Sequence, residues 1–297
     1  MKLLPMMLAA LIAMPVAAQA QGRLDKIKET GQLTLGVRES SIPFSYLDDA
    51  QKPVGYSIDI CHGIVDALKE KLGLEQLQVK QIPVTSSTRI PLVANGTVDI
   101  SCGSATNNEQ RQQQVSFAPT TFVTSTRFAS LKSSGISDLA DLKGATVIST
   151  AGTSNLRWLT QVNAEEKLGM RIMNAKDHSE AFLTVNSGRA VAFFMDDILL
   201  AGLVANSRNA DDWTISEKAY TVEPYGMILP KDDPEFKQVV DEAVKAMMQD
   251  GRLKKMYQKW FTQPIPPRNI NLNWPMSAEL EKVIANPTDS PRPEDYK

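Results

Sequence analysis

The sequence has few of the residues that build metal centres. Its 297 residues include two cysteines, Cys61 and Cys102, and two histidines. A zinc site needs several cysteine or histidine ligands at characteristic short spacings, and these four residues do not offer such spacings. We therefore expect no metal site, and we expect the protein to work without a cofactor.

Neither sign of charge predominates. Lys and Arg total 32 and Asp and Glu total 34, which gives a formal net charge of −2. Nucleic acids and anionic membranes attract proteins through clustered Lys and Arg. The composition therefore argues against both partners, and affinity for a small anion must come from a few well-placed cations.

Long apolar runs are absent after the first twenty residues, and the run at 3–16 is typical of a signal peptide. Lys2 precedes it as the positive end, and Ala-Gln-Ala at 18–20 offers a cleavage site with small residues. A membrane anchor is the alternative, but this run contains two prolines and is shorter than the roughly 20 residues that a span needs. We expect residues 1–20 to be removed and the mature protein to be exported.

The two cysteines have two possible states. An even number of cysteines in an exported protein favours a disulfide between Cys61 and Cys102. The alternative is two buried free thiols, since free cysteine is among the most buried residue types.

Strand and helix patterns alternate along the chain, which predicts an α/β fold. The alternation occurs twice, and the stretches at 122–128 and 218–223 could cross between two lobes. We therefore predict a discontinuous first lobe at 21–124 plus 220–268, a second lobe at 125–219, and an extended C-terminal tail at 269–297. Two crossing strands would form a hinge that lets the lobes close on a ligand.

Polar side chains stand where predicted strands end or helices begin, which is where α/β proteins form ligand sites. Each one alone is more often a surface cation, a helix cap or a turn residue. Together they define a candidate binding site. Its members are Arg38, Ser86, Arg89, Ser104, Thr106, Thr153, Ser154, His178 and Asp196.

Several longer motifs carry a resemblance to a known family. They are GVRESSIPFSY at 36–46, GYSID at 55–59, TSSTRIPL at 85–92, NGTVD at 95–99, CGSATNN at 102–108, AKDH at 175–178, SGRAVAFFMDD at 187–197 and WFTQPIPP at 260–267. From 24 to about 272 the chain resembles the periplasmic polar amino-acid-binding proteins of bacterial ABC importers. It is most similar to their glutamate/aspartate-binding branch.

This resemblance implies a type II periplasmic-binding-protein fold, in which two α/β lobes close on the ligand. It implies that Arg89 binds the α-carboxylate, helped by backbone N–H groups near Thr153 and Ser154. It further implies that the ammonium is held by Ser104, Thr106 and Asp196, and the distal carboxylate by Arg38, Ser86 and His178. The protein would capture L-glutamate or L-aspartate as a monomer and deliver it to the membrane permease subunits of the importer.

The chain also departs from the family pattern. Ala105 stands where the branch commonly has threonine. Close relatives pair the cysteine at 102 with one near 227, whereas this chain has Met227 there and Cys61 elsewhere. Either Cys61 is a relocated partner or Cys102 stays free.

Two other functions are compatible with the sequence. Some dehydratases resemble these binding proteins, and His178 with Asp196 could serve as acid and base in such an enzyme. The second of these functions is that of a receptor domain that senses a ligand.

Overall fold

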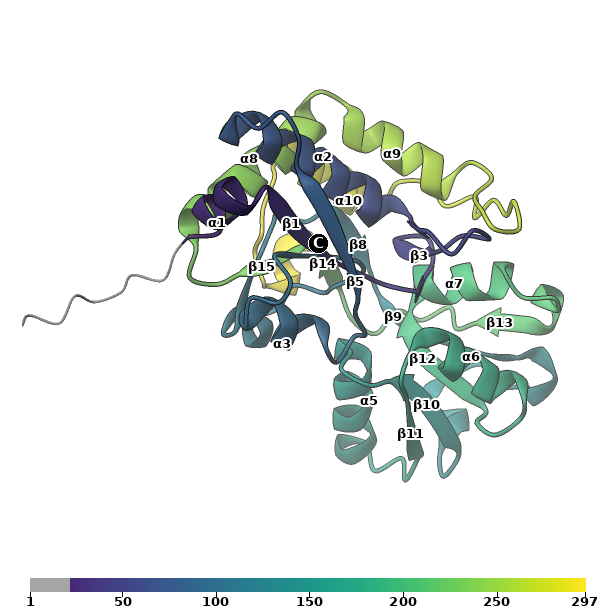
Figure 1. Ribbon diagram of the computed structural model, residues 1–297. Coiled ribbons are helices and arrows are strands. Elements are labelled where there is room, and N and C mark those ends of the chain that lie inside the picture. Colours follow the sequence, from purple (N-terminus) through teal and green to yellow (C-terminus); the bar gives the residue numbers. More distant parts are fainter. Residues whose placement is uncertain (1–21) are drawn as a thin grey trace, which may run out of the picture.

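The computed structural model describes residues 22–297, so the predicted signal peptide lies outside the described residues. Two five-stranded sheets organise the chain into two lobes (Figure 1). The sheet of the first lobe has the order β5-β1-β6-β15-β7. Its strands are β1 (Gln32–Val37), β5 (Gln78–Pro83), β6 (Ile100–Cys102), β7 (Val115–Phe117) and β15 (Ile228–Pro230). β5, β1 and β6 are parallel, and β15 runs antiparallel to both β6 and β7.

The second sheet repeats this plan, with the order β11-β10-β12-β9-β13. Its strands are β9 (Thr126–Leu131), β10 (Thr146–Thr150), β11 (Arg171–Ala175), β12 (Ala192–Asp196) and β13 (Trp213–Ile215). β11, β10 and β12 are parallel, whereas β9 is antiparallel to β12 and β13. The α/β class and the two lobes predicted from the sequence are confirmed.

Helices cover the faces of both sheets, because parallel strands need cover on both sides. In the first lobe these are α1 (Arg23–Thr30), α2 (Tyr56–Leu72), α3 (Arg89–Ala94), α4 (Glu109–Gln112), α8 (Pro234–Gln249) and α9 (Arg252–Phe261). In the second lobe they are α5 (Ser154–Glu165), α6 (His178–Asn186) and α7 (Asp197–Ala205). A small sheet of β2 (Ser40–Ser41), β3 (Ser45–Leu47) and β4 (Pro53–Val54) lies beside the first lobe's core. Within the described part of the chain, no helix has the length and apolarity that a membrane span requires.

Both connections between the large sheets run through one antiparallel pair, β8 (Phe122–Thr124) and β14 (Glu223–Tyr225). Glu223 pairs with Thr124, and Tyr225 pairs with Phe122. Phe44 packs edge-on against both Phe122 and Tyr225. The pair therefore forms a hinge whose first-lobe end is fixed in an aromatic core.

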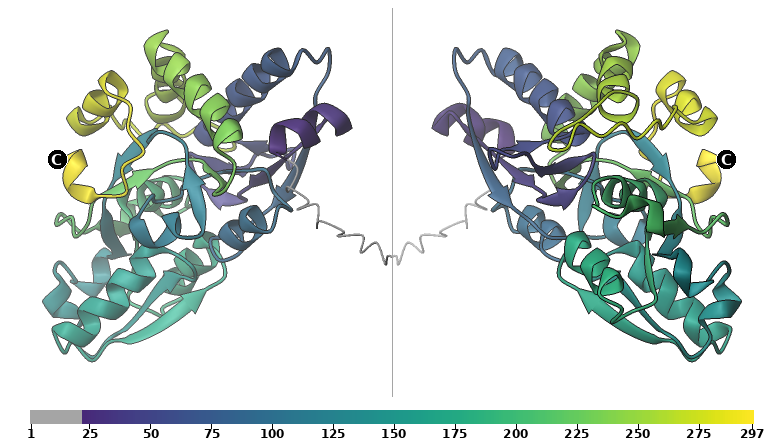
Figure 2. Two further views of the ribbon diagram at one scale, coloured as in Figure 1. Left: turned by 90° about the vertical axis from the view of Figure 1, so that its left-hand side faces the viewer. Right: turned by 90° about the vertical axis from the view of Figure 1, so that its right-hand side faces the viewer.

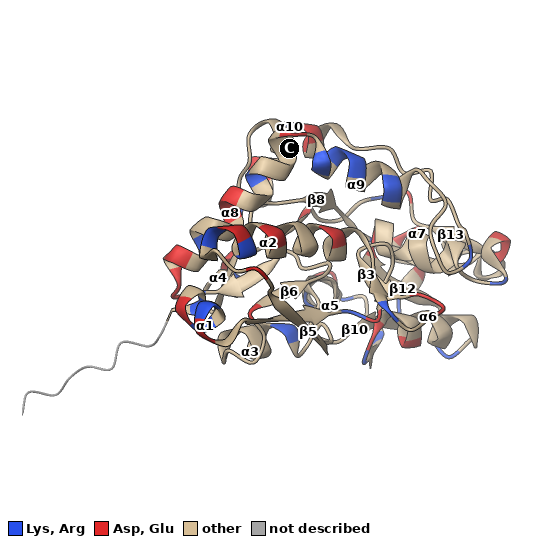
Figure 3. Cartoon of the chain, turned by 45° about the horizontal axis from the view of Figure 1, so that its top comes forward, with Lys and Arg blue, Asp and Glu red and all other residues tan. Residues whose placement is uncertain are grey.

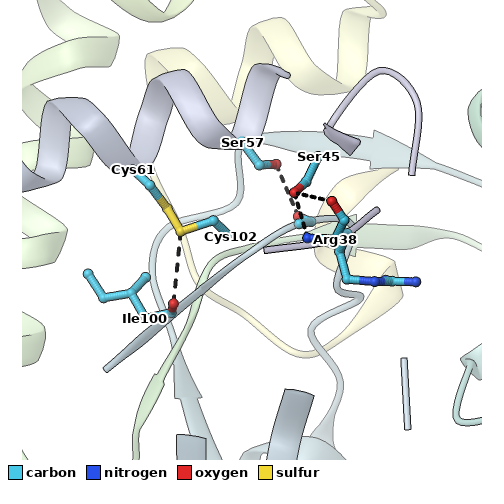
Figure 4. Close-up of a disulfide and its surroundings, with 7 residues drawn as sticks. Arg38, Ser45, Ser57, Cys61, Ile100 and Cys102 are labelled. Atoms are coloured by element: carbon cyan, nitrogen blue, oxygen red, sulfur yellow. Dashed lines mark hydrogen bonds between the residues drawn. A yellow bond between two sulfur atoms is a disulfide. The ribbon is translucent and has the colours of Figure 1, made fainter. Parts of the chain in front are cut away.

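The disulfide predicted between Cys61 and Cys102 is present. It joins α2 to the end of β6, and Figure 4 shows Arg38 nearby, with its backbone held by Ser45. Ser57, one turn before Cys61 on α2, donates a hydrogen bond to the carbonyl of Gly103 across 3.1 Å. The bridge and this bond together fix the loop after β6, which carries two of the predicted site residues.

The C-terminal tail corrects an expectation, because it is not extended throughout. Residues Ala278–Ala285 form helix α10, with Ser277 accepting a hydrogen bond from the Leu280 N–H as its N-cap. Leu280, Val283 and Tyr296 are buried, the last in a short 3₁₀ helix at Pro293–Tyr296. In Figure 2 this segment, in yellow, lies along the first lobe. The apolar spacing of α10 was masked in the sequence by the prolines on either side.

Charged residues of both signs are spread over the two lobes (Figure 3). The most evident basic stretch is on α9, which contains Arg252, Lys254, Lys255 and Lys259. Acidic residues lie on the neighbouring helices α2 and α8. This distribution agrees with the near-neutral balance of the sequence.

Candidate ligand-binding site

The predicted site residues meet in one small cavity between the lobes. The parallel strands of both sheets end at this cavity, so the residues that follow them converge there. Eight of the nine predicted residues line it, and the ninth, Arg38, contacts the lining residue His178. The lining comprises Ser86, Arg89, Ser104, Thr106, Thr153, Ser154, Asn155, His178, Met195, Asp196 and Leu199.

Two arginines of the first lobe make one side of the site strongly cationic. Arg38 follows β1 and Arg89 opens α3, and both are almost fully buried. Arg89 donates through Nη1 to the carbonyl of Ser104 at 2.8 Å. Burial lowers the pKa of Arg38 to about 10 and the pKa of Arg89 well below its ordinary value. In the described structure neither is paired with a carboxylate, and a buried cation without a counterion is unfavourable.

Four polar atoms of this side have no hydrogen-bond partner among the described residues. They are Nη1 of Arg38, Nε of Arg89 and the hydroxyl oxygens of Ser86 and Ser104. Buried polar groups are nearly always hydrogen-bonded in folded proteins, and each exception calls for an explanation. Guanidinium nitrogens and hydroxyls can donate to carboxylate oxygens, so these atoms suit an anionic ligand.

His178 connects the second lobe to Arg38. Its Nε2 lies 3.3 Å from Nη2 of Arg38, and its Nδ1 lies 2.9 Å from the hydroxyl of Thr150. An arginine can only donate, so Nε2 accepts and Nδ1–H is directed to Thr150. Burial, together with the charges of Arg38 and Arg89, lowers the pKa of His178 well below its ordinary value. The imidazole is therefore neutral and orients the guanidinium of Arg38.

Asp196 supplies the anionic side of the site. It ends β12 and is 3% exposed. The amide of Asn155 donates to its Oδ1 at 2.6 Å, and the hydroxyl of Tyr225 donates to its Oδ2. Burial raises the pKa of Asp196 to about 7, and the nearby charge of Glu223 adds to this effect. A cationic group placed beside Asp196 would stabilise its ionised form.

The lobes contact each other directly around the cavity, so they are in a closed arrangement. Arg111 of α4 donates to the carbonyl of Thr106 at 2.7 Å and to that of Gly152, in the other lobe, at 3.1 Å. Gly152 has a φ of +79°, and a Cβ there would lie 2.6 Å from Cα of Ser87. Only glycine allows so close an approach of the second lobe to the first.

Thr153 begins α5 as its N-cap. Its hydroxyl accepts from the Leu156 N–H and donates to the carbonyl of Thr150. Because that hydroxyl is already occupied, the contribution of Thr153 to a ligand is limited to its backbone and the free N–H groups of the first helical turn.

Sequence reasoning missed five residues that shape the site. They are Arg111, Thr150, Asn155, Glu223 and Tyr225. Asn155 could have been included, since it follows Thr153 and Ser154 at the helix start. Thr150 contacts His178 within the second lobe, whereas Glu223 and Tyr225 reach the second lobe from the hinge. Arg111 contacts Thr106 in its own lobe and Gly152 in the other. No local sequence pattern reveals these contacts.

The sequence pattern of the bacterial extracellular solute-binding proteins, family 3, matches residues 33–263. This chain belongs to that family. The match spans both sheets and the hinge, so it covers the whole site described above.

Two curated relatives resemble this solute-binding protein over almost all of its length. The L-glutamate/L-aspartate-binding protein of Pseudomonas aeruginosa is 53% identical over 95% of this chain and 94% of the relative. The glutamate/aspartate import solute-binding protein of Escherichia coli K12 is 48% identical over 92% of this chain and 91% of the relative. Both are binding proteins, which favours a binding function here over the dehydratase-like alternative.

Solved structures place the solute-binding protein among amino-acid-binding folds. An ancestral arginine-binding protein bound to arginine superposes with a TM-score of 0.69 at 29% identity, covering 78% of this chain and 98% of that chain. The type II periplasmic-binding-protein fold expected from the sequence is confirmed.

Proposed function

We propose that this solute-binding protein binds L-glutamate or L-aspartate in the cavity between its lobes. Such a ligand brings two carboxylates and one ammonium. The observation that supports the proposal is that one site contains two buried arginines without a counterion and, opposite them, one buried aspartate. A neutral or basic amino acid would leave one of the two guanidiniums buried without a counterion, at a large cost in free energy. The relatives from P. aeruginosa and E. coli are named for the same two ligands.

The ligand would lie with its α-carboxylate at Arg89 and at the backbone N–H groups near Thr153 and Ser154. Nε of Arg89 has no partner within the described residues, and α5 begins at Ser154, where its dipole favours an anion. The ammonium would lie among Ser104, Thr106 and Asp196.

The distal carboxylate would be bound by Arg38 and Ser86, and His178 would contribute by orienting the guanidinium of Arg38. Nη1 of Arg38 and the hydroxyl of Ser86 are available for this role. The first lobe contributes both arginines, and the second contributes His178 and Asp196, so the complete site exists only when the lobes are closed. Ligand binding therefore stabilises the closed form.

The closed, loaded protein would deliver its ligand to the permease subunits of an ABC importer, acting as a monomer in the periplasm. The family membership and the import function in the name of the E. coli relative support this role.

Calorimetric titration of the protein without residues 1–20 tests the ligand assignment. We expect L-glutamate and L-aspartate to bind, and L-glutamine and L-arginine to bind at least tenfold more weakly, because truncating one partner of a buried charge pair commonly costs about 2–5 kcal/mol. Equal affinity for glutamine and glutamate would contradict the proposal.

A further inference from the structure

A chain of hydrogen bonds joins both lobes and the hinge beside the cavity. The hydroxyl of Ser154, in the second lobe, donates to Oε2 of Glu223 across 2.8 Å. The same hydroxyl lies 3.1 Å from the hydroxyl of Thr106, in the first lobe. Glu223 belongs to hinge strand β14 and is 4% exposed. Thr106 and Ser154 line the cavity, whereas Glu223 lies behind them.

The chemistry of Glu223 fixes the direction of this chain. A carboxylate has no proton to donate, and a hydroxyl has one. Since Ser154 gives its only proton to Glu223, it can meet Thr106 only as an acceptor. Thr106 must then give its own proton to Ser154. The chain therefore runs in one direction, from Thr106 through Ser154 to Glu223.

This direction decides what the two hydroxyls offer to a ligand. With both protons committed, Thr106 and Ser154 can present only lone pairs to the cavity. Asp196, whose oxygens already accept from Asn155 and Tyr225, adds further acceptor capacity on the same wall. An ammonium with three donors suits such a wall, whereas a group that offers only lone pairs is repelled by it.

The surrounding bonds hold the members of the chain in place. Arg111 donates to the carbonyl of Thr106 at 2.7 Å, which fixes its backbone. Thr106 also forms a β-bridge with Tyr225, which lies two residues after Glu223 in hinge strand β14. The charge of Glu223 in turn opposes the effect of burial on the pKa of Arg111. The three members of the chain are thus fixed relative to one another.

We propose that Glu223 is a specificity-determining residue that acts through Ser154 and Thr106, making the wall beside Asp196 accept hydrogen bonds only and so selecting ligands with an α-ammonium. This role rests on the proposed binding of an acidic amino acid. Glu223 is a positioning residue here, because its carboxylate contacts the hydroxyl of Ser154 and does not line the cavity.

The test compares L-glutamate with glutarate, which keeps both carboxylates and lacks the ammonium. Glu223→Gln preserves size but supplies an amide that can donate as well as accept. We expect the ratio of the two affinities, measured by calorimetry and by displacement of L-glutamate, to fall by about tenfold, because a hydrogen bond to a charged group is worth about that factor or more. The matched control is Glu242→Gln, an exposed glutamate on α8, which should leave the ratio unchanged.

A double-mutant cycle gives a second readout. If Glu223 acts through Ser154, then Glu223→Gln should add little to the loss of glutamate affinity already caused by Ser154→Ala. Equal weakening of glutamate and glutarate in Glu223→Gln, or additive losses in the cycle, would show a merely structural role and overturn the inference. Failure of the unmodified protein to bind either acidic amino acid would instead overturn the proposed function. Thermal unfolding of each variant verifies that it is folded.

Discussion

Nε2 of His178 accepts a hydrogen bond from Nη2 of Arg38 across 3.3 Å, so a neutral ring from one lobe orients a buried cation from the other. The hydroxyl of Thr150 holds the opposite side of the ring. The protein thereby directs Arg38 without adding a third positive charge to a site that already contains Arg38 and Arg89. Nη1 of Arg38 has no partner among the described residues and is left for the proposed distal carboxylate.

Replacing Arg38 should therefore weaken ligand binding without destabilising the fold. In Arg38→Ala we expect L-glutamate affinity to fall by more than tenfold, because truncating one member of a buried charge pair costs about 2–5 kcal/mol. The thermal midpoint without ligand should change little, since the variant also removes an unpaired buried charge. Calorimetry and thermal unfolding measure the two effects. Arg252→Ala, on the exposed surface of α9, is the control, and unchanged affinity in Arg38→Ala would refute its role.

Affinity should rise with pH between 5 and 7 and then remain constant. Burial raises the pKa of Asp196 to about 7 in the ligand-free site, and a bound ammonium lowers it again. Below pH 7, binding must then release a proton from Asp196, so affinity increases as pH rises toward 7. Above that value Asp196 is already ionised, and the dependence disappears.

The measurement is calorimetry at pH 6 and pH 8 in two buffers of different ionisation enthalpy. The observed enthalpy should depend on the buffer at pH 6 and not at pH 8. His178 has a pKa well below its ordinary value and stays neutral across this range. An affinity that falls as pH rises through 7 would instead indicate a protonated His178 at the ligand and would contradict the neutral ring.

The disulfide should stabilise the first lobe. Cys61 and Cys102 close a loop with a sequence separation of 41, for which chain entropy predicts a contribution of about 3–4 kcal/mol. Cys61→Ala/Cys102→Ala should therefore unfold at a lower guanidinium concentration than the oxidised protein. The same comparison under reducing conditions is the control, because reduction should remove most of the difference. Identical midpoints for the oxidised protein and the double variant would show that the bridge adds nothing.

The sequence predicts the binding residues better than the residues that hold them. Arg38, Arg89 and Asp196 stand at strand ends or helix starts, where the fold class alone places ligand groups. Glu223 and Tyr225 do not, because they lie within a short hinge strand whose residues show only an ordinary buried pattern. Their importance comes from contacts with the other lobe, and these depend on closure.

The extended conformation predicted for the C-terminal tail is wrong for a different reason. Its prolines and polar residues are typical of mobile segments, yet Leu280 and Val283 are spaced for one face of a helix and are buried. The tail forms a helix because it packs against the first lobe, and amino-acid composition does not predict such packing.

Hydrogen bonds attach the C-terminal tail to the hinge. The hydroxyl of Tyr296 donates to the carbonyl of Ser290 at 2.8 Å and lies 2.8 Å from the hydroxyl of Thr120, which must therefore be the donor. Thr120 lies just before hinge strand β8, and its N–H donates to the carbonyl of Thr288. Nearby, the amide of Asn107, next to Thr106, donates to the carbonyl of Asp289. The tail thus fixes both the hinge and the loop that carries Thr106.

Tyr296→Phe should lower the free energy of unfolding by about 1–2 kcal/mol, because it removes two hydrogen bonds and leaves the carbonyl of Ser290 and the hydroxyl of Thr120 without that partner. Tyr220→Phe is the matched control: the Tyr220 hydroxyl is buried without a hydrogen-bond partner among the described residues, so its removal should cost nothing. Guanidinium denaturation of both variants measures the difference. If the two variants unfold at the same midpoint, the Tyr296 hydroxyl does not stabilise the fold, and the tail is anchored by its other contacts.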